Sequence, residues 1–225
     1  MKIIIIGGLG TSMVIADQIY DAKQRYNMDV EVIGLALDDH SKGDSICGYP
    51  ILCDIKDVYE KYKAYDDVKL IYALHRPDRI RERTKLLYDL NIPIDKFCNF
   101  IHPSVLLAHT AKIGLGNVIL ANCIINHGAV LGNFNTINSC TLIGHDTTVG
   151  NNNFFAAHVV TSSGITIGDM NFIGLNSAIH RSMGSGNLVG QCSNCIKEIG
   201  DDATVFGNPA VPRGGVEKKP DGYKY

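Results

Sequence analysis

The sequence has little net charge and no long apolar run. Its 21 Lys and Arg residues nearly balance 23 Asp and Glu residues, which leaves a formal net charge of −2. No broad positive surface for nucleic acid or an anionic membrane is therefore expected. The four isoleucines of Ile3–Ile6 are too few for a secretory signal, which needs about seven to fifteen apolar residues, and no stretch approaches the roughly eighteen of a membrane span. We predict a soluble, cytoplasmic protein.

The cysteines do not form a recognisable framework either. Seven of them lie at scattered positions, an odd count that favours reduced thiols over disulfide bridges. Cys192 and Cys195 form one C-x-x-C pair, but a four-cysteine zinc site would need a second pair, and none lies at a suitable spacing. We therefore predict reduced thiols and no bound metal.

Residues 1–98 alternate short apolar runs with amphipathic segments. Strands are predicted over residues 3–6, 30–37 and 69–74, with a helix after the first strand and another over residues 77–90 that starts with Pro77. Strands that alternate with helices indicate a parallel sheet with right-handed crossovers. We predict a small Rossmann-like α/β domain over residues 1–98.

From Ile101 onward, apolar residues recur every six positions. A helix or an alternating strand cannot hold this period, so each hexapeptide must be one structural unit. Three units form an 18-residue coil of a triangular prism, which predicts a left-handed parallel β-helix over residues 99–214, followed by a polar tail over 215–225. The residues of the period, all large and apolar except Thr161, are Ile101, Leu107, Ile113, Ile119, Ile125, Leu131, Ile137, Ile143, Val149, Phe155, Thr161, Ile167, Ile173 and Ile179.

Residues 18 apart in such a coil lie above one another. His109, His127, His145 and Ser163 have this spacing, and each follows an inward position by two residues, which places them in one column at a corner of the prism. A histidine, with an ordinary pKa of about 6.5, is suited to remove a proton from an attacking amine or hydroxyl. Only His145 is followed by a carboxylate, Asp146, although neighbouring side chains of an extended segment point to opposite faces and need not touch.

The segment Gly7–Ser12 lies between the first predicted strand and the first helix. Its N–H groups can hold a diphosphate at the helix N-terminus. Gly8 and Gly10 match the start of the dinucleotide fingerprint, but the third glycine is absent, which argues against a dinucleotide. With Asp38 and Asp39 after the second strand, the segment favours a sugar nucleotide, and a tight structural turn is the alternative.

Several motifs occur together along the chain. They are GGLG after the first strand, LDD after the second, GYPIL, FIHPSV at the junction of the halves, INSCTLIGHDTTVG, and GNPA near the end. In this combination the chain resembles the sialic-acid and bacillosamine-type sugar acyltransferases, which join a nucleotide-sugar-binding α/β domain to a hexapeptide β-helix. The resemblance covers nearly the whole chain and implies a homotrimer with acetyl-CoA in the groove between neighbouring β-helices.

The resemblance implies a metal-independent N-acyltransferase that uses acyl-CoA, most simply acetyl-CoA, and acts on a nucleotide-linked amino sugar in surface-polysaccharide or glycan biosynthesis. It makes His145 the general base with Asp146 beside it, and the column leaves His127 as a secondary candidate. The implied acyl-CoA contacts are Ser163, Gly164, Gly174, Pro209 and Ala210, and the implied nucleotide-sugar contacts are Gly8, Gly10, Thr11, Ser12, Asp38 and Asp39.

Two positions depart from this family. Its members commonly carry a histidine directly after the glycine-rich turn and another half a coil beyond the catalytic one, where this sequence has Thr11 and Phe154. The sugar, its nucleotide and the length of the acyl chain therefore stay open.

Three other functions fit parts of the sequence. The acceptor of the same reaction could be a hydroxyl, as in sugar O-acetylation. The stacked histidines also suit a metal enzyme of the gamma-carbonic-anhydrase type, although the His-x-x-x-x-His pair of that family is absent here. A scaffold that binds a sugar nucleotide without catalysis is the third alternative.

Overall fold

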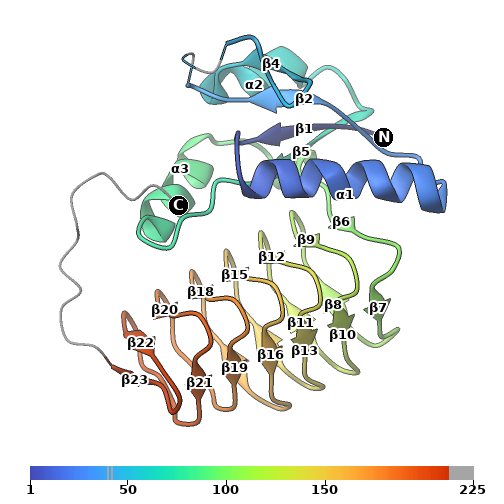
Figure 1. Ribbon diagram of the computed structural model, residues 1–225. Coiled ribbons are helices and arrows are strands. Elements are labelled where there is room, and N and C mark those ends of the chain that lie inside the picture. The colour runs from blue at the N-terminus through green and yellow to red at the C-terminus, as the bar shows by residue number, and fades with distance from the viewer. Residues whose placement is uncertain (40, 42, 213–225) are drawn as a thin grey trace.

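The computed structural model describes residues 1–39, 41 and 43–212 of the chain. Figure 1 shows an α/β layer, formed by the N-terminal residues, that lies along one side of a long coil of short strands. The predicted tail over 215–225 lies outside the described residues. In the part of the chain that the structure describes, no helix is long and apolar enough to cross a membrane.

The N-terminal sheet is built around a fully buried first strand. β1 (Lys2–Ile6) pairs in parallel with β2 (Glu31–Ala36) and β5 (Val68–Tyr72), and β2 pairs in parallel with β4 (Tyr49–Cys53). The short β3 (Ser45–Ile46) adds an antiparallel edge, so the order is β3-β4-β2-β1-β5. The isoleucines of β1 are buried on both faces, because helices or the β-helix cover both sides.

Three α-helices accompany this sheet within the residues that the structure describes. They are α1 (Thr11–Tyr26), α2 (Val58–Tyr62) and α3 (Ile80–Asp89), and two 3-10 turns, η2 (Ile55–Asp57) and η3 (Ile94–Lys96), lie in the connections. The predicted alternation of strands and helices is therefore present, with more and shorter elements than the sequence indicated.

Two details of that prediction are wrong. Pro77 does not start the third helix, because Arg79 donates its N–H to the carbonyl of Arg76 at 3.2 Å in a turn, and α3 begins only at Ile80. The guanidinium of Arg76 pairs with Asp78 at 2.8 Å, which stabilises this turn. The prediction also missed β3, β4 and α2, whose few residues are too short to show a period.

From residue 100 the chain winds into a prism with three strand-built faces. The docked face has eight strands, β6, β9, β12, β15, β18, β20, β22 and β23. The open face has six, β7, β10, β13, β16, β19 and β21, and the short face has four, β8, β11, β14 and β17. Consecutive coils pair in parallel, and β23 turns back antiparallel to β22. This confirms the predicted parallel β-helix, and its left-handed sense stays a prediction.

The strands of the coil are only two or three residues long. Their bounds are β6 (Phe100–Ile101), β7 (Leu106–Leu107), β8 (Lys112–Ile113), β9 (Val118–Ile119), β10 (Ile124–Ile125), β11 (Val130–Leu131), β12 (Thr136–Ile137), β13 (Leu142–Ile143), β14 (Thr148–Val149), β15 (Phe154–Phe155), β16 (Val160–Thr161), β17 (Thr166–Ile167), β18 (Phe172–Ile173), β19 (Ala178–Ile179), β20 (Leu188–Val189), β21 (Asn194–Cys195), β22 (Thr204–Phe206) and β23 (Val211–Pro212).

The hexapeptide period fills the interior of the prism. From Ile119 to Ile179, every residue of the predicted period is at most 2% exposed. Stacking at 18 residues holds as far as Ile179, which pairs with Thr161, whereas Met183 pairs with Ile167 only sixteen residues earlier. The turn over residues 180–182 is therefore two residues shorter than the turns below it.

A ladder of buried asparagines forms hydrogen bonds between consecutive coils at the corner between the short and docked faces. Asn117, Asn135, Asn153 and Asn171 are all fully buried, and each Oδ1 accepts the backbone N–H of the asparagine one coil further along, as in Asn153 to Asn135 at 2.9 Å. These side chains satisfy backbone groups that the tight turns leave unpaired.

Both corners that bound the docked face contact the N-terminal layer. At one corner Gln18 of α1 donates to the Ser139 hydroxyl at 2.8 Å and accepts the N–H of Ala121 at 2.7 Å. At the other corner the Tyr88 hydroxyl of α3 lies 2.9 Å from Nδ2 of Asn152. The third corner, between the open and short faces, therefore lies on the far side of the prism from the α/β layer (Figure 1).

Candidate active site

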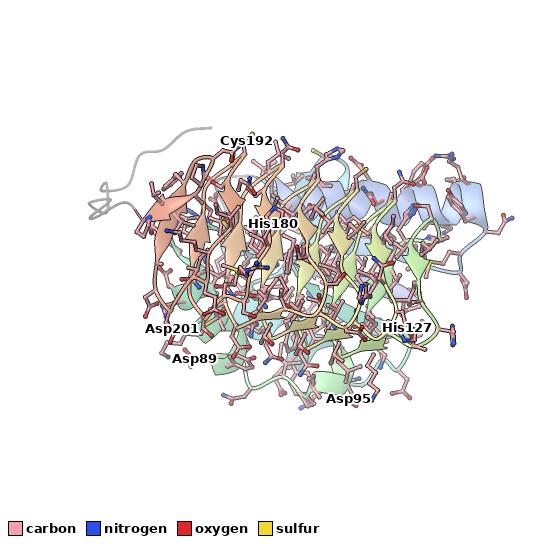
Figure 2. All side chains as sticks on the ribbon, turned by 90° about the horizontal axis from the view of Figure 1, so that it is seen from below. Asp89, Asp95, His127, His180, Cys192 and Asp201 are labelled. Carbon is pink, nitrogen blue, oxygen red and sulfur yellow. The ribbon has the colours of Figure 1, made fainter. Side chains whose placement is uncertain are left out.

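The predicted histidine column is present at this far corner. β13 pairs with β10 and β10 with β7, each with an 18-residue offset, so the turns that carry His109, His127 and His145 lie above one another. Asp146 donates its N–H to the carbonyl of His127, and Gly164 donates to the carbonyl of His145, both at 2.8 Å. All three imidazoles are exposed, and Figure 2 shows His127 on the side turned away from α1.

His145 and Asp146 touch, although their positions are consecutive. Nδ1 of the imidazole lies 2.8 Å from Oδ2 of the carboxylate, and both side chains are more than half exposed. Asp146 has a φ of 57°, the left-handed conformation, because it is the second residue of the turn. This conformation breaks the alternation of an extended strand and brings the two side chains to the same side.

The imidazoles of the other two histidines pair with no carboxylate among the described residues. Nδ1 of His127 lies 3.0 Å from the hydroxyl of Thr110, which also accepts the N–H of Gly128 at 3.0 Å. No hydrogen bond or ion pair of the His109 ring occurs among the described residues. Of the column, His145 alone has an acidic group that fixes one ring nitrogen.

The backbone beside His145 is irregular. Gly144 donates its N–H to the side-chain hydroxyl of Thr161 at 2.9 Å, where the other coils use the carbonyl of the inward residue. Thr161 is the one polar residue of the inward period. The N–H of Ser163, one coil beyond His145, has no acceptor among the described residues, and the same holds for the N–H groups of His109, His127 and His145 at this turn position.

The residues expected to contact acyl-CoA are only partly brought together. Ser163 and Gly164 lie in the column, directly beyond His145. The loop with Pro209 and Ala210 stacks on the last strand of the open face, where Ala210 donates its N–H to Asn194 at 2.8 Å. Gly174 lies elsewhere, at the corner between the docked and open faces, where a side chain would meet the backbone of the next coil at 2.6 Å. Its glycine is explained by this close packing.

A pocket of about 400 Å³ opens at the carboxyl edge of the N-terminal sheet. Four of the residues predicted to contact a sugar nucleotide line it: Gly8, Thr11, Ser12 and Asp39. The predicted residues Gly10 and Asp38 do not line it. Its remaining walls are Leu9, Leu37, Ile46, Ala73, Leu74, His75, Arg76 and Arg83.

The two aspartates after β2 have different surroundings. Oδ1 of Asp38 accepts the N–H of Ile55 at 2.8 Å and so caps η2. Oδ1 of Asp39 accepts the N–H and the hydroxyl of Ser41, at 3.1 and 2.5 Å, while the residue lines the pocket. The geometry therefore separates a structural carboxylate from one that faces the pocket.

Sequence reasoning missed His75, Arg76 and Arg83 as pocket residues. A signal was available, because His75 and Arg76 follow β5, and the carboxyl ends of parallel strands meet at one edge of a sheet. Nε2 of His75 lies 2.9 Å from the Thr136 hydroxyl of β12, so this residue also joins the pocket to the docked face. Burial lowers the pKa of His75 to about 4, so the imidazole is neutral near pH 7.

Phe154 lies beside the pocket rather than beside His145. Its ring centroid is 5.2 Å from that of His75 and 4.6 Å from that of Phe172, with which it stacks. An apolar ring at this position therefore supports the orientation of His75.

The cysteines and possible metal ligands are also placed. All seven cysteines are free thiols, and burial raises the pKa of Cys98, Cys123 and Cys195 to about 11. Within residues 1–39, 41 and 43–212, no group of three or more His, Cys, Asp or Glu is arranged to hold a metal ion.

No family model and no curated protein matches the sequence, but solved structures match the fold. Perosamine N-acetyltransferase from Caulobacter crescentus, solved as a mutant with CoA and GDP-perosamine, matches with a TM-score of 0.82 at 20% identity, over 96% of this chain and 98% of that one. The acetyltransferase domain of PglB from Neisseria gonorrhoeae matches at 0.78 and 23% identity, over 94% and 99%. WeeI from Acinetobacter baumannii matches at 0.71 and 20% identity, over 95% and 100%. The chain shares its fold with these proteins over nearly its whole length.

Proposed function

We propose that the chain is an acyl-CoA-dependent N-acyltransferase, most simply an acetyltransferase, whose acceptor is a nucleotide-linked amino sugar. The observation that carries the proposal is the exposed His145–Asp146 pair, at 2.8 Å, one coil before the free N–H of Ser163. The shared fold supports it, since one matching structure holds CoA and GDP-perosamine and another, of the PglB domain, holds acetyl coenzyme A.

His145 acts as the general base in this proposal. In this proposal Nδ1 keeps its proton and donates a hydrogen bond to the carboxylate of Asp146, so Nε2 carries the lone pair that faces the acceptor. The amine of the sugar attacks the thioester carbonyl carbon, and its proton passes to Nε2. When the tetrahedral intermediate collapses, the C–S bond breaks, and the imidazolium returns the proton to the departing thiolate of CoA.

The donor site follows the column toward the C-terminal coils. The N–H of Ser163 is the donor for the oxyanion, and Gly164 beside it leaves room for the pantetheine chain. Pro209 and Ala210 lie further along the open face, which adds about 4.8 Å with each coil. A long, thin donor along this face would reach both groups.

Within one chain, the proposed acceptor pocket and the proposed base lie on opposite sides of the prism. The pocket lies on the α/β layer, next to the docked face, whereas His145 lies at the opposite corner of the prism. We therefore propose a homotrimer in which the pocket of one copy faces the His145 corner of its neighbour. The proposed domains are residues 1–98 for the acceptor and residues 99–214 for catalysis, in a cytoplasmic protein of polysaccharide or glycan biosynthesis.

The test is a screen of UDP-, GDP- and dTDP-linked 4-amino sugars with acetyl-CoA, in which the release of free thiol is followed. Thiol release with an amino sugar and not with its hydroxy analogue supports the N-acyltransferase. Release only with a hydroxy sugar would make the chain an O-acetyltransferase with the same base. Activity that disappears on chelation and returns with zinc would favour metal chemistry at the three stacked histidines.

A further inference from the structure

One bond between two coils at the candidate site differs from its counterparts along the prism. Between positions 102 and 190, the residue after each inward position donates its N–H to the carbonyl of the inward residue one coil further along, as Ser162 does to Ile179 at 2.8 Å. The exception is Gly144, which donates to the side-chain hydroxyl of Thr161 at 2.9 Å. Thr161 is only 2% exposed and is the one polar residue of the predicted inward period.

The strand ladder of the open face is interrupted at the same place. β13 pairs with β10, and β16 pairs with β19, through two residue pairs each, whereas β13 and β16 share the single pair of Leu142 with Val160. The pair of Ile143 with Thr161 is absent, and the carbonyl of Thr161 does not accept the N–H of Gly144. The hydroxyl of Thr161 therefore replaces its own carbonyl as the acceptor, and the ladder stays open between these two coils.

Thr161 lies between the two groups that the proposed reaction uses. The bond that it accepts holds the residue directly before His145. Ser163, whose N–H is the proposed oxyanion donor, follows Thr161 by two residues. On the other side of the turn, Gly164 donates to the carbonyl of His145 at 2.8 Å. His145 is therefore flanked by two bonds to the next coil, and the one before it depends on a side chain.

We propose that Thr161 is a positioning residue, whose hydroxyl keeps the ladder open and thereby sets the distance between the imidazole of His145 and the N–H of Ser163. Both groups must reach one tetrahedral centre in the proposed reaction, so their separation controls the rate. The inference rests on the proposed function and adds a residue that touches neither substrate.

Two substitutions separate the hydroxyl from its packing. Thr161→Val keeps a side chain of similar shape and leaves Gly144 the main-chain carbonyl as its acceptor, so the ladder should close. We expect kcat to fall about tenfold or more, since a misplacement of about 1 Å can cost about 10²-fold. The KM for acetyl-CoA should hardly change, and the melting temperature should stay level or rise, because no backbone donor is left unpaired.

Thr161→Ser is the complementary variant. It keeps the acceptor for Gly144, so kcat should stay close to that of the wild type. The lost methyl group leaves a small cavity in the prism, so the melting temperature should fall. The inference thus expects the more stable variant to be the less active one.

Thr141→Val is the matched control. Thr141 is equally buried, and its hydroxyl donates to the carbonyl of Ala156 at 3.1 Å, at the corner between the docked and open faces. Loss of this bond should lower the melting temperature and leave kcat unchanged. If kcat instead followed the melting temperature, with Thr161→Ser less active than Thr161→Val, the role of Thr161 would be structural only, and the inference would be overturned.

Crystal structures of the wild type and of Thr161→Val give a readout that does not depend on activity. The inference expects Gly144 to donate to the carbonyl of residue 161 in the variant, and the turns of His145 and Ser163 to lie at a different separation. Turns that superimpose in the two proteins, or a wild-type kcat of Thr161→Val, would overturn it, while thiol release with an amino-sugar nucleotide still supports the acyltransferase. If the wild type releases no thiol with any sugar nucleotide, the proposed function fails, and the catalytic role of Thr161 fails with it.

Discussion

The carbonyl oxygen of His145 accepts the N–H of Gly164 at 2.8 Å, so the backbone of the candidate base is fixed to the next coil. Its imidazole projects outward from this bond and takes no part in the packing of the prism. A substitution of the His145 side chain should therefore leave the backbone in place and change only the chemistry of the imidazole.

Replacing His145 with Ala should lower kcat by about 10² to 10⁴, which is the usual contribution of a positioned general base. The affinity for acetyl-CoA should hardly change, because the base acts on the proton of the acceptor. Steady-state kinetics and calorimetry with acetyl-CoA measure the two effects. An active His145→Ala protein combined with an inactive His127→Ala protein would show that the site lies one coil earlier.

The rest of the column supplies the controls for that measurement. His109→Ala should be nearly neutral, since its ring has no bonded partner within the described residues. His127→Ala should lower kcat less than His145→Ala does. Its ring bonds only the hydroxyl of Thr110 on an exposed turn, and that bond has no part in the proposed proton transfer. All three variants should elute from a sizing column as the wild type does.

The open face predicts how copies of the chain associate. Its outward residues form an apolar stripe, in which Leu106 is 61% and Val160 46% exposed, with Ile124 and Leu142 partly exposed between them. Light scattering should give about three times the chain mass for the wild type. Val160→Glu should reduce that mass, since a buried unpaired charge is costly, whereas Thr148→Glu on the short face should not. A monodisperse wild-type monomer would contradict the shared site.

The parts of the fold that depend on a repeated local pattern could be predicted from the sequence. The apolar residues from Ile119 to Ile179 recur every six positions and predicted the coil. Three such repeats make one turn of 18 residues, which predicted that His145 lies above His127. The prediction missed the contact between His145 and Asp146, because it assumed the alternation of an extended strand, whereas a left-handed residue recurs every six positions, as at Cys140, Asp146 and Asn152.

The pocket at the carboxyl edge of the N-terminal sheet is lined by residues from distant segments. Ser12 and Asp39 were expected, because they lie in the segments that follow β1 and β2, at the edge where the parallel strands end. Arg83 comes from the middle of α3, and its side chain reaches the pocket only through the packing of that helix on the sheet. His75 is fixed by Thr136, 61 positions later in the chain, which periodicity cannot reveal.

Disruption of the asparagine ladder should destabilise the β-helix. Asn135→Ala removes the acceptor for the N–H of Asn153 and the donor to the carbonyl of Gly150, at 2.9 Å each. Each buried group left without a partner costs about 1–3 kcal/mol, so the free energy of unfolding should fall by roughly 2–6 kcal/mol. Denaturant titration measures this, with the exposed Thr148→Ala as control. A change below about 1 kcal/mol would mean that water replaces the lost bonds.

His75 should make the stability of the protein depend on pH in a defined window. Its pKa is about 4 in the folded chain, because burial disfavours the charged ring, and about 6.5 when unfolded. Between these values the unfolded chain binds the proton and the folded chain does not, so stability falls as the pH drops from 6.5 to 4 and stays level, for this group, below 4. The loss amounts to at most about 3 kcal/mol.

His75→Gln keeps a bond to the Thr136 hydroxyl and cannot titrate, so its unfolding free energy should fall less over the same window. Denaturant titrations of both proteins from pH 7 to pH 4 measure the difference. Parallel curves would show that the ring is protonated in the folded protein, and that its place between Thr136 and Phe154 does not depend on a neutral imidazole.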